Sequence, residues 1–250
     1  MEHGTICLYA DKGVGLQAFQ CMKECLSRLA GDIYSLQILS AAEVIDGGWR
    51  HDARLFVMPG GADEPYARKL AGTGNVRIRE FVKNGGSYLG VCAGAYYGCA
   101  RIVFDEGSAS EIVEERELRF FDGTAVGPVF PPYDAASNRG CRAVRIENAE
   151  NGFDVYFNGG CTFVPRREGK DFTVMAAYGG AERAPAVISV ACGAGRVVLS
   201  GVHFEYAPER MNADDVWQAP LRSVLQKSEA ARVAFINDVA EELRLERNFK

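Results

Sequence analysis

One cysteine lies in a pattern that is typical of a nucleophile. An apolar run that predicts a buried strand meets an Ala- and Tyr-rich run that predicts a helix, at the pentad Gly90-Val91-Cys92-Ala93-Gly94. Such a turn strains the backbone of the cysteine and crowds the residues two before and two after it, which favours glycine there. The amino end of the helix favours the thiolate. The sequence therefore predicts Cys92 as a nucleophile, and the alternative is a buried structural cysteine.

A cysteine nucleophile needs a base, and that base needs an orienting group. Of the three histidines, His203 follows a predicted strand over residues 196–200, so it lies at the same sheet edge as Cys92 if the two strands are parallel. Glu205 is two residues further on and points to the same side in an extended segment. The spacing predicts a Cys92–His203–Glu205 triad. The alternative is that His203 and Glu205 form an unrelated polar pair.

Acyl transfer at a thiol also requires two N–H groups directed at the developing oxyanion. One is predicted from Ala93, directly after the nucleophile, and the other from Gly60 or Gly61 at the end of a predicted strand over residues 55–58. The alternative for these glycines is a simple turn. Aromatic residues are candidates for the pocket wall, and core packing is the alternative for each: Tyr66, Tyr96, Tyr97, Tyr133 and Tyr156.

The elements that must position these residues follow a β-α-β-α rhythm. Strands are predicted over residues 5–9, 33–39 and 55–58 and before Cys92, with helices between them, which indicates an α/β fold with a mostly parallel sheet. From about residue 105 to 170 the rhythm breaks into an irregular or antiparallel β-rich insertion. Further strands are expected over residues 172–178, 186–191 and 196–200, and C-terminal helices over about 214–248. Without a clear linker or repeat, one domain over residues 1–250 is the simplest count.

Composition excludes several classes of function. The 250 residues carry a net charge of −5 without a basic cluster, which argues against nucleic acid as a partner, and no apolar run is long enough to span a membrane. Eight cysteines without a signal-peptide pattern predict free thiols and a cytoplasmic location. Cys21 and Cys25 have no His or further Cys nearby in sequence, so we expect no metal site, and nothing calls for an organic cofactor.

Three segments together resemble a known superfamily. Their order and spacing are similar to those of the class I glutamine amidotransferase-like proteins: Met58-Pro59-Gly60-Gly61, Gly90-Val91-Cys92-Ala93-Gly94 and His203-Phe204-Glu205. More narrowly, segments 59–66, 90–97 and 155–160 resemble the N-terminal domain family of biotin–protein ligases. The resemblance implies a flavodoxin-like three-layer sandwich. It also implies the roles given above to Cys92, His203, Glu205, Gly60, Gly61 and Ala93, with Tyr66, Tyr96 and Asn158 as substrate-binding candidates.

Two departures from the superfamily pattern bear on the substrate. Glutaminases of this class carry Gly-x-Gln where this chain has Gly94-Ala95-Tyr96, and His-Pro-Glu where it has His203-Phe204-Glu205. The missing Gln weakens the expectation of glutamine as substrate. The nucleotide-binding signature of the biotin ligase catalytic domain is absent from the sequence, so we do not expect this chain to ligate biotin by itself.

The favoured hypothesis is a cysteine-dependent hydrolase or amidotransferase-like enzyme that acts on an amide or ester, either small or peptide-like. The second hypothesis is a non-catalytic ligand-binding or regulatory module that keeps the shape of the site. An intracellular peptidase comes last, because such relatives often place the catalytic His directly after the Cys, where this chain has Ala93. A partner enzyme or a second copy of the chain is compatible with the C-terminal helices.

Overall fold

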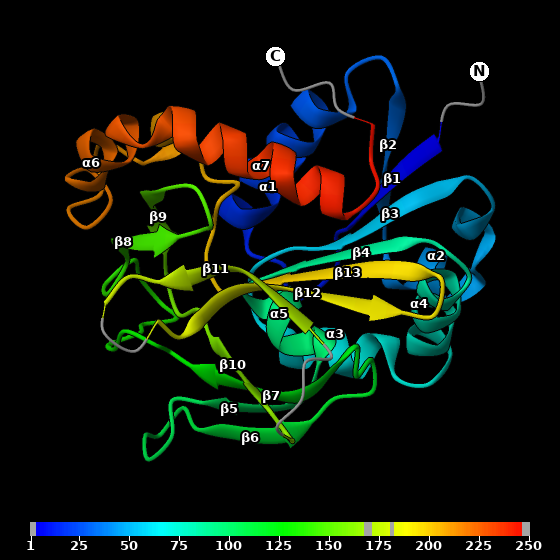
Figure 1. Cartoon of the computed structure of the whole chain (residues 1–250). Helices are drawn as coiled ribbons and strands as arrows, with labels where there is room; N and C mark the ends of the chain where they lie inside the picture. Colours follow the sequence, from blue (N-terminus) through cyan, green and yellow to red (C-terminus); the bar gives the residue numbers. More distant parts are fainter. Residues whose placement is uncertain (1–3, 168–171, 181–182, 247–250) are drawn as a thin grey trace.

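A nine-stranded sheet forms the centre of the molecule in a computed structural model that describes residues 4–167, 172–180 and 183–246. Its strand order is β2-β1-β3-β4-β13-β12-β11-β8-β9 (Figure 1). The first half consists of β2 (Tyr34–Leu39), β1 (Gly4–Tyr9), β3 (Ala53–Met58), β4 (Ser87–Val91) and β13 (Gly195–Ser200). The second half consists of β12 (Pro185–Cys192), β11 (Phe172–Tyr178), β8 (Arg142–Glu147) and β9 (Gly152–Phe157).

The two halves of this sheet differ in strand direction. Neighbours from β2 to β13 pair in parallel, whereas every pairing from β13 to β9 is antiparallel. The sheet is therefore mixed, and the predicted parallel arrangement describes the half that carries the elbow. A tight turn between Cys192 and Gly195 joins β12 to β13, and such a turn can connect only antiparallel strands.

Helices cover both faces of the sheet, as predicted for a three-layer sandwich. In Figure 1, α1 and α7 lie on one face, where their apolar side chains share a core cluster with β1, β3, β4 and β13. The other face packs against α2, α3, α4 and α5 in a second cluster. The helices are α1 (Leu16–Ala30), α2 (Ala41–Asp46), α3 (Asp63–Leu70), α4 (Thr73–Lys83), α5 (Ala93–Gly98), α6 (Leu221–Lys227) and α7 (Glu229–Glu242), with 3₁₀ turns at Gly48–His51 and Pro208–Arg210.

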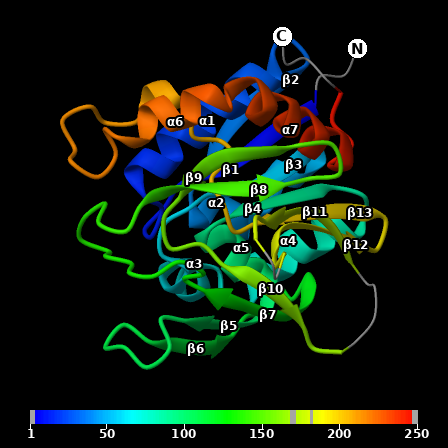
Figure 2. The same cartoon turned by 60° about the vertical axis from the view of Figure 1, so that its left-hand side comes forward.

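The predicted β-rich insertion divides between two sheets. A separate four-stranded sheet has the order β10-β7-β5-β6 and lies beyond α5. Its strands are β5 (Cys99–Phe104), β6 (Ile112–Glu115), β7 (Phe121–Gly127) and β10 (Thr162–Pro165). The β8–β9 hairpin instead extends the central sheet beside α6 and α7 (Figure 2). The expected insertion bounds thus miss β5, and residues 168–170 lie outside the described part.

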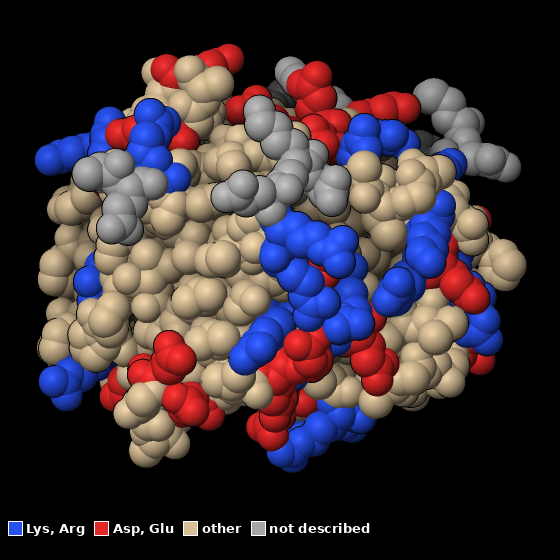
Figure 3. Space-filling model, turned by 60° about the horizontal axis from the view of Figure 1, so that its bottom comes forward, with Lys and Arg blue, Asp and Glu red and all other residues tan. Residues whose placement is uncertain are grey.

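The C-terminal segment is less helical than expected over residues 214–248. Helix begins at Leu221, because turns around Asp215 and Gln218 occupy the preceding residues, and α7 ends at Glu242. Residues 247 and 248 fall outside the described range. In that range no helix has the length and apolar character needed to cross a membrane. Figure 3 shows one face, on which groups of Lys and Arg lie beside groups of Asp and Glu.

Candidate functional site

Cys92 lies at a sharp turn between β4 and α5. Its φ is +50°, a value that is strained for a residue with a side chain, and its N–H donates to the Ser200 carbonyl at 2.8 Å. A Cβ atom at Gly90 would lie 2.3 Å from the Gly94 carbonyl oxygen, and one at Gly94 would lie 2.0 Å from the Met58 oxygen. Both glycines of the pentad are therefore required for close backbone contact. The strand–turn–helix geometry that the pattern predicts is present.

The parallel pairing of β4 and β13 brings His203 to Cys92. Val91 lies opposite Ser200 in this pairing, so the two chains leave the sheet at the same edge. His203 and Cys92 line the same cavity and their side chains interact electrostatically, and His203 Nδ1 lies 2.7 Å from Glu205 Oε1. All three side chains are buried. The structure thus brings together the three residues predicted as a triad.

Burial and two neighbouring side chains change the pKa of His203 in opposite directions. Burial lowers the pKa of His203, but the Glu205 carboxylate and the Cys92 side chain outweigh it and raise this pKa to about 10. Protonated His203 is therefore the favoured form near neutral pH. An imidazolium in this position can stabilise a neighbouring thiolate.

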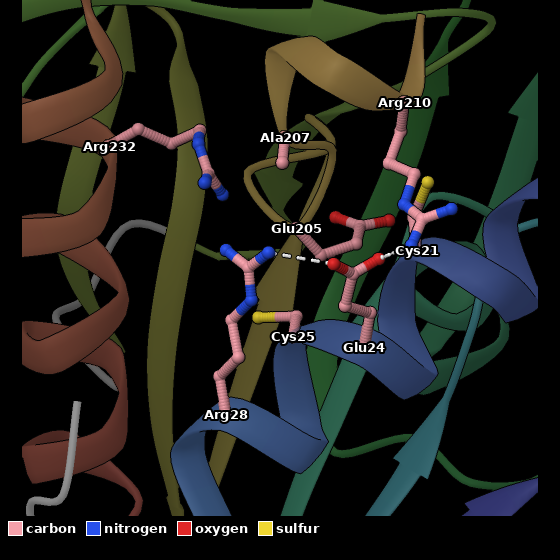
Figure 4. Close-up of a pocket in the computed structure, with 8 residues that line it drawn as sticks. All are labelled: Cys21, Glu24, Cys25, Arg28, Glu205, Ala207, Arg210 and Arg232. Atoms are coloured by element: carbon pink, nitrogen blue, oxygen red, sulfur yellow. Dashed lines mark hydrogen bonds and ion pairs between the residues drawn. The ribbon is translucent and has the colours of Figure 1, made fainter. Parts of the chain in front are cut away.

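Positive charge surrounds the carboxylate of Glu205 on the side away from Cys92. A small cavity of about 10 Å³ lies here, and Figure 4 shows the side chains that line it, which come from α1, from α7 and from the segment after His203. Arg28 and Arg210 both form ion pairs with Glu24 beside it, and Arg232 of α7 lies on another side. Glu205 Oε2 has no hydrogen-bond partner among the described residues, so Oε1 alone holds the ring of His203.

The predicted oxyanion-hole residues lie next to the sulfur. A Cβ atom on Gly60 would lie 2.7 Å from His203 Cε1 and 3.5 Å from Cys92 Cβ, so only glycine fits. Gly61 has a φ of +148°, and the loop is fixed by Gly15 N–H to Gly60 O at 3.1 Å and by Ala62 N–H to Gly13 O at 2.8 Å.

These two loop bonds do not use the N–H of Gly61, which has no hydrogen-bond acceptor in the described part of the chain. Ala93 is the first residue of α5, so its N–H has no acceptor within the helix. Gly61 and Ala93 both line a cavity that contains Cys92. Their two N–H groups can therefore meet at a carbonyl oxygen bound there.

The three predicted substrate-binding residues have different surroundings. Tyr66 is 0% exposed and donates to the Pro59 carbonyl at 3.2 Å, so it lies on the inner face of α3, behind the glycine loop, and supports that loop. Its contact with substrate stays a prediction. Tyr96 lines the cavity at Cys92 and donates to Gly159 O at 3.0 Å. The Asn158 carbonyl lies 3.7 Å from Cys92 Sγ, and Asn158 lines a second cavity.

Cys92 lies between these two cavities. The larger has a volume of about 400 Å³ and is bounded by the elbow, the start of α3, strands β5 and β6 and the loop around Tyr133. The smaller, of about 210 Å³, lies on the His203 side, towards α1. Gly61, Cys92 and Tyr133 border both. A substrate carbonyl at the sulfur can therefore extend in two directions.

The sequence did not identify two further residues that hold the triad. Tyr206 contacts the ring of His203, with centroids 4.8 Å apart, and stacks on Tyr156 at 4.5 Å. Arg232 donates to the carbonyl of Phe204 at 2.7 Å. Tyr206 could have been proposed from the sequence, because it follows His203 by three residues. Arg232 could not, because it is distant from His203 in the sequence. Among the described residues, no group of three or more His, Cys, Asp or Glu side chains could hold a metal ion.

Comparisons with known sequences point to one family. The family described as "Biotin-protein ligase, N terminal" has a sequence model that matches residues 5–250. A biotin–protein ligase of Schizosaccharomyces pombe is 36% identical over 185 residues, which make up 71% of this chain and 29% of that protein. An uncharacterized protein of Chlamydia muridarum is 41% identical over 165 residues, or 64% of each chain. The matched regions therefore span less than two thirds of either relative.

Comparisons with solved structures concern the fold alone, because identities are low. A glutamine amidotransferase crystal structure has a TM-score of 0.56 at 17% identity, and the match covers 93% of this chain and 99% of that one. A ThuA-like protein from Bacteroides uniformis has a TM-score of 0.53 at 11% identity, with 99% and 95% of the two chains covered. The predicted glutamine amidotransferase-like fold is confirmed.

Proposed function

This chain belongs to the biotin–protein ligase N-terminal family, and we propose that it is a cysteine-dependent hydrolase or amidotransferase-like enzyme that acts on an amide or ester. The predicted family resemblance is confirmed by the match over residues 5–250. The observation that carries the proposed activity is the buried contact of His203 with Cys92 on one side and Glu205 on the other. Biotin ligation by this chain alone is not part of the proposal.

The proposed reaction has two acyl-transfer steps. The Cys92 thiolate attacks the carbonyl carbon, and the N–H groups of Gly61 and Ala93 stabilise the oxyanion. His203 gives its proton to the leaving amine or alcohol as the carbon–heteroatom bond breaks, which leaves a thioester on the sulfur. His203 then takes a proton from water, which hydrolyses the thioester to an acid. An acceptor amine from a partner enzyme in place of water would make the second step an amide transfer.

Turnover of an amide and ester panel, with Cys92→Ser and Cys192→Ser compared with wild type, tests this function. Cys192 lies in the strand hairpin, apart from the site, and its loss controls for general effects of removing a thiol. We expect at least about a hundredfold loss of kcat for Cys92→Ser and little change for Cys192→Ser, with an acyl adduct on Cys92 in wild type by intact mass spectrometry. Unchanged turnover in Cys92→Ser would contradict the mechanism.

A non-catalytic ligand-binding role is the second candidate. The volume of the larger cavity, about 400 Å³, is enough for a small metabolite and favours this role if the thiol is unreactive. A ligand that copurifies with the protein and leaves Cys92 unmodified would favour binding over catalysis, provided that the reactivity of the Cys92 thiol does not depend on His203. Partners, quaternary structure and the cytoplasmic location remain predictions.

A further inference from the structure

The two cavities at Cys92 have different chemical linings. The larger cavity has apolar and aromatic walls from Tyr96, Ile102, Phe104 and Ile112, with Tyr133 at its border. The smaller cavity is lined mainly by polar side chains and rings, among them Gln17, Asn138, Asn158 and His203. The larger cavity can enclose a group of about the size of an arylalkyl chain, and the smaller one a short polar group.

The position of His203 determines which end of the substrate lies in which cavity. The group that protonates the leaving atom must lie on the side where that atom departs. His203 lines the smaller cavity and is absent from the lining of the larger one. The leaving group therefore departs into the smaller cavity, and the acyl chain lies in the larger cavity, next to Gly61 and Ala93.

The charge of the larger cavity decides which acyl chains it can hold. Its lining includes Asp63, Glu64 and Asp134 and, among the described residues, no Lys, Arg or His. Asp63 pairs with buried Arg116 at 2.7 Å, and Glu64 pairs with Arg68. Hydrogen bonds from the Ser137 hydroxyl and the Ala136 N–H lower the pKa of Asp134, which keeps it ionised. The described lining of this cavity therefore carries no cation, and Arg116 and Arg68, which pair with two of its carboxylates, are not part of that lining.

Glutamine does not match this cavity. Its acyl chain ends in an α-ammonium group, with which Asp134 can pair, and in an α-carboxylate, and placing that carboxylate in a cavity whose lining carries no cation costs free energy. Burying an aromatic or aliphatic chain against these walls, in contrast, is favourable because it removes apolar surface from water.

From these observations we infer the substrate class: the amide of an apolar, aromatic-sized carboxylic acid without negative charge, with ammonia or a small amine as the leaving group. The inference rests on the proposed function for the acyl and leaving-group roles. The sulfur–acyl bond forms as the carbon–nitrogen bond breaks, and the proton from His203 goes to the departing nitrogen. Water then replaces sulfur, so that amide and water give acid and amine.

The smaller cavity fits an amine better than an alcohol. Asn158 lines it, and the main-chain carbonyl oxygen of Asn158 lies 3.7 Å from Cys92 Sγ. An N–H of a leaving amine can donate to this carbonyl, whereas the leaving oxygen of an ester carries no hydrogen to donate. Its volume of about 210 Å³ limits the amine to a small one.

Binding to a Cys92→Ala protein tests the substrate class without any chemistry. The two ligands are phenylbutanamide, which is apolar, and glutaramate, the monoamide of glutaric acid, which is anionic. Calorimetric titration of the full chain should show phenylbutanamide binding at least about tenfold more tightly than glutaramate, as burial of the ring predicts. Equal binding of the two ligands, tighter binding of glutaramate, or no binding of either would overturn the inference.

A matched pair of variants on β6 checks that the ligand occupies the larger cavity. Ile112 lines the cavity, whereas its neighbour Val113 is 42% exposed and points to the other face of the strand. In the Cys92→Ala protein, Ile112→Lys should weaken phenylbutanamide at least about tenfold and strengthen glutaramate, and Val113→Lys should change neither. An equal effect of both substitutions would place the ligand elsewhere.

The ligand comparison stands without these variants, so a misfolded Ile112→Lys protein does not remove the test. The proposed function fails by a different result, which is a Cys92 thiol whose reactivity is independent of His203. A protein with that thiol could still prefer phenylbutanamide, and a reactive Cys92 could still prefer glutaramate. The two failures are therefore distinguishable.

Discussion

At the scale of single residues, the glycines around Cys92 are the most tightly constrained positions, because the backbone there leaves no room for a Cβ atom. Gly94→Ala should lower the free energy of unfolding by at least about 2 kcal/mol, because the new Cβ would lie 2.0 Å from the Met58 oxygen. Gly48→Ala is the control, since the nearest atom to its Cβ is a side-chain oxygen of Asp46 at 3.3 Å. Equilibrium unfolding in urea measures both. Equal stability of the two variants would contradict the close contact.

The histidine of the site gives a second prediction at this scale. The folded pKa of His203 is raised from 6.5 to about 10 by Glu205 and Cys92 against the effect of burial, so the folded state binds the proton more tightly than the unfolded state. Its stabilisation is complete below the unfolded pKa and is lost as the pH rises towards the folded one. A Cys92 thiolate formed on folding releases a proton and offsets the one that His203 takes up, so the test uses a Cys92→Ala background. There the stability advantage of His203 over His203→Gln should shrink as the pH rises from about 6.5 towards 8, by up to about 1.4 kcal/mol per pH unit.

Urea unfolding of both proteins at matched pH values measures this difference. With the Cys92 thiol removed, and because the window ends before the other cysteines titrate in the unfolded chain, the change reports on the histidine. A difference that stays constant from about pH 6 to about pH 8 would contradict a raised pKa of His203.

At the scale of elements, α7 fixes the segment that carries the triad. Arg232 is 2% exposed and donates to the Phe204 carbonyl, between His203 and Glu205. Arg232→Met should cost about 1–3 kcal/mol of unfolding free energy, because that carbonyl loses its buried donor. It should also slow alkylation of Cys92.

Arg222→Met on the exposed side of α6 is the control and should change stability by less than about 0.5 kcal/mol. Urea unfolding and thiol alkylation of both variants give the comparison. If Arg232→Met were as stable as this control, α7 would not hold the segment.

The sequence was sufficient for the elements with strong local signals. The first four strands, the elbow and the hairpin before β13 follow from apolar runs and glycines, and they place Cys92 and His203 at one edge. The insertion was not predictable in this way, because β8 and β9 join the central sheet through pairings distant in sequence. The side to which Tyr66 points was not predictable, because an aromatic residue in an amphipathic helix has the same pattern whether it faces core or cavity.

At the scale of the whole molecule, one core connects the two sheets. The apolar cluster that contains Tyr88 and Leu199 of the central sheet also contains Ile102, Phe121 and Phe163 of the four-stranded sheet. Because α5 leads directly into β5, the elbow itself joins them. We therefore predict a single cooperative unfolding transition, as expected for one domain.

Hydrogen exchange at increasing urea tests this prediction, with peptides from β4 and β7 as the two probes. Both peptides should lose protection at the same urea concentration. Earlier exposure of β7 would show that the four-stranded sheet unfolds as a separate unit and that two domains describe the chain better.

The central claim is that His203 activates Cys92, and the most direct measurement is the rate of Cys92 alkylation by iodoacetamide as a function of pH. Mass spectrometry of digested wild type and His203→Gln gives this rate, with Cys192 as the internal control in each digest. We predict rapid alkylation of Cys92 near neutral pH, below the pKa of about 8.5 of a free thiol, and loss of this rapid alkylation in His203→Gln with Cys192 unchanged. A Cys92 thiol that titrates like an ordinary cysteine in both proteins would contradict it.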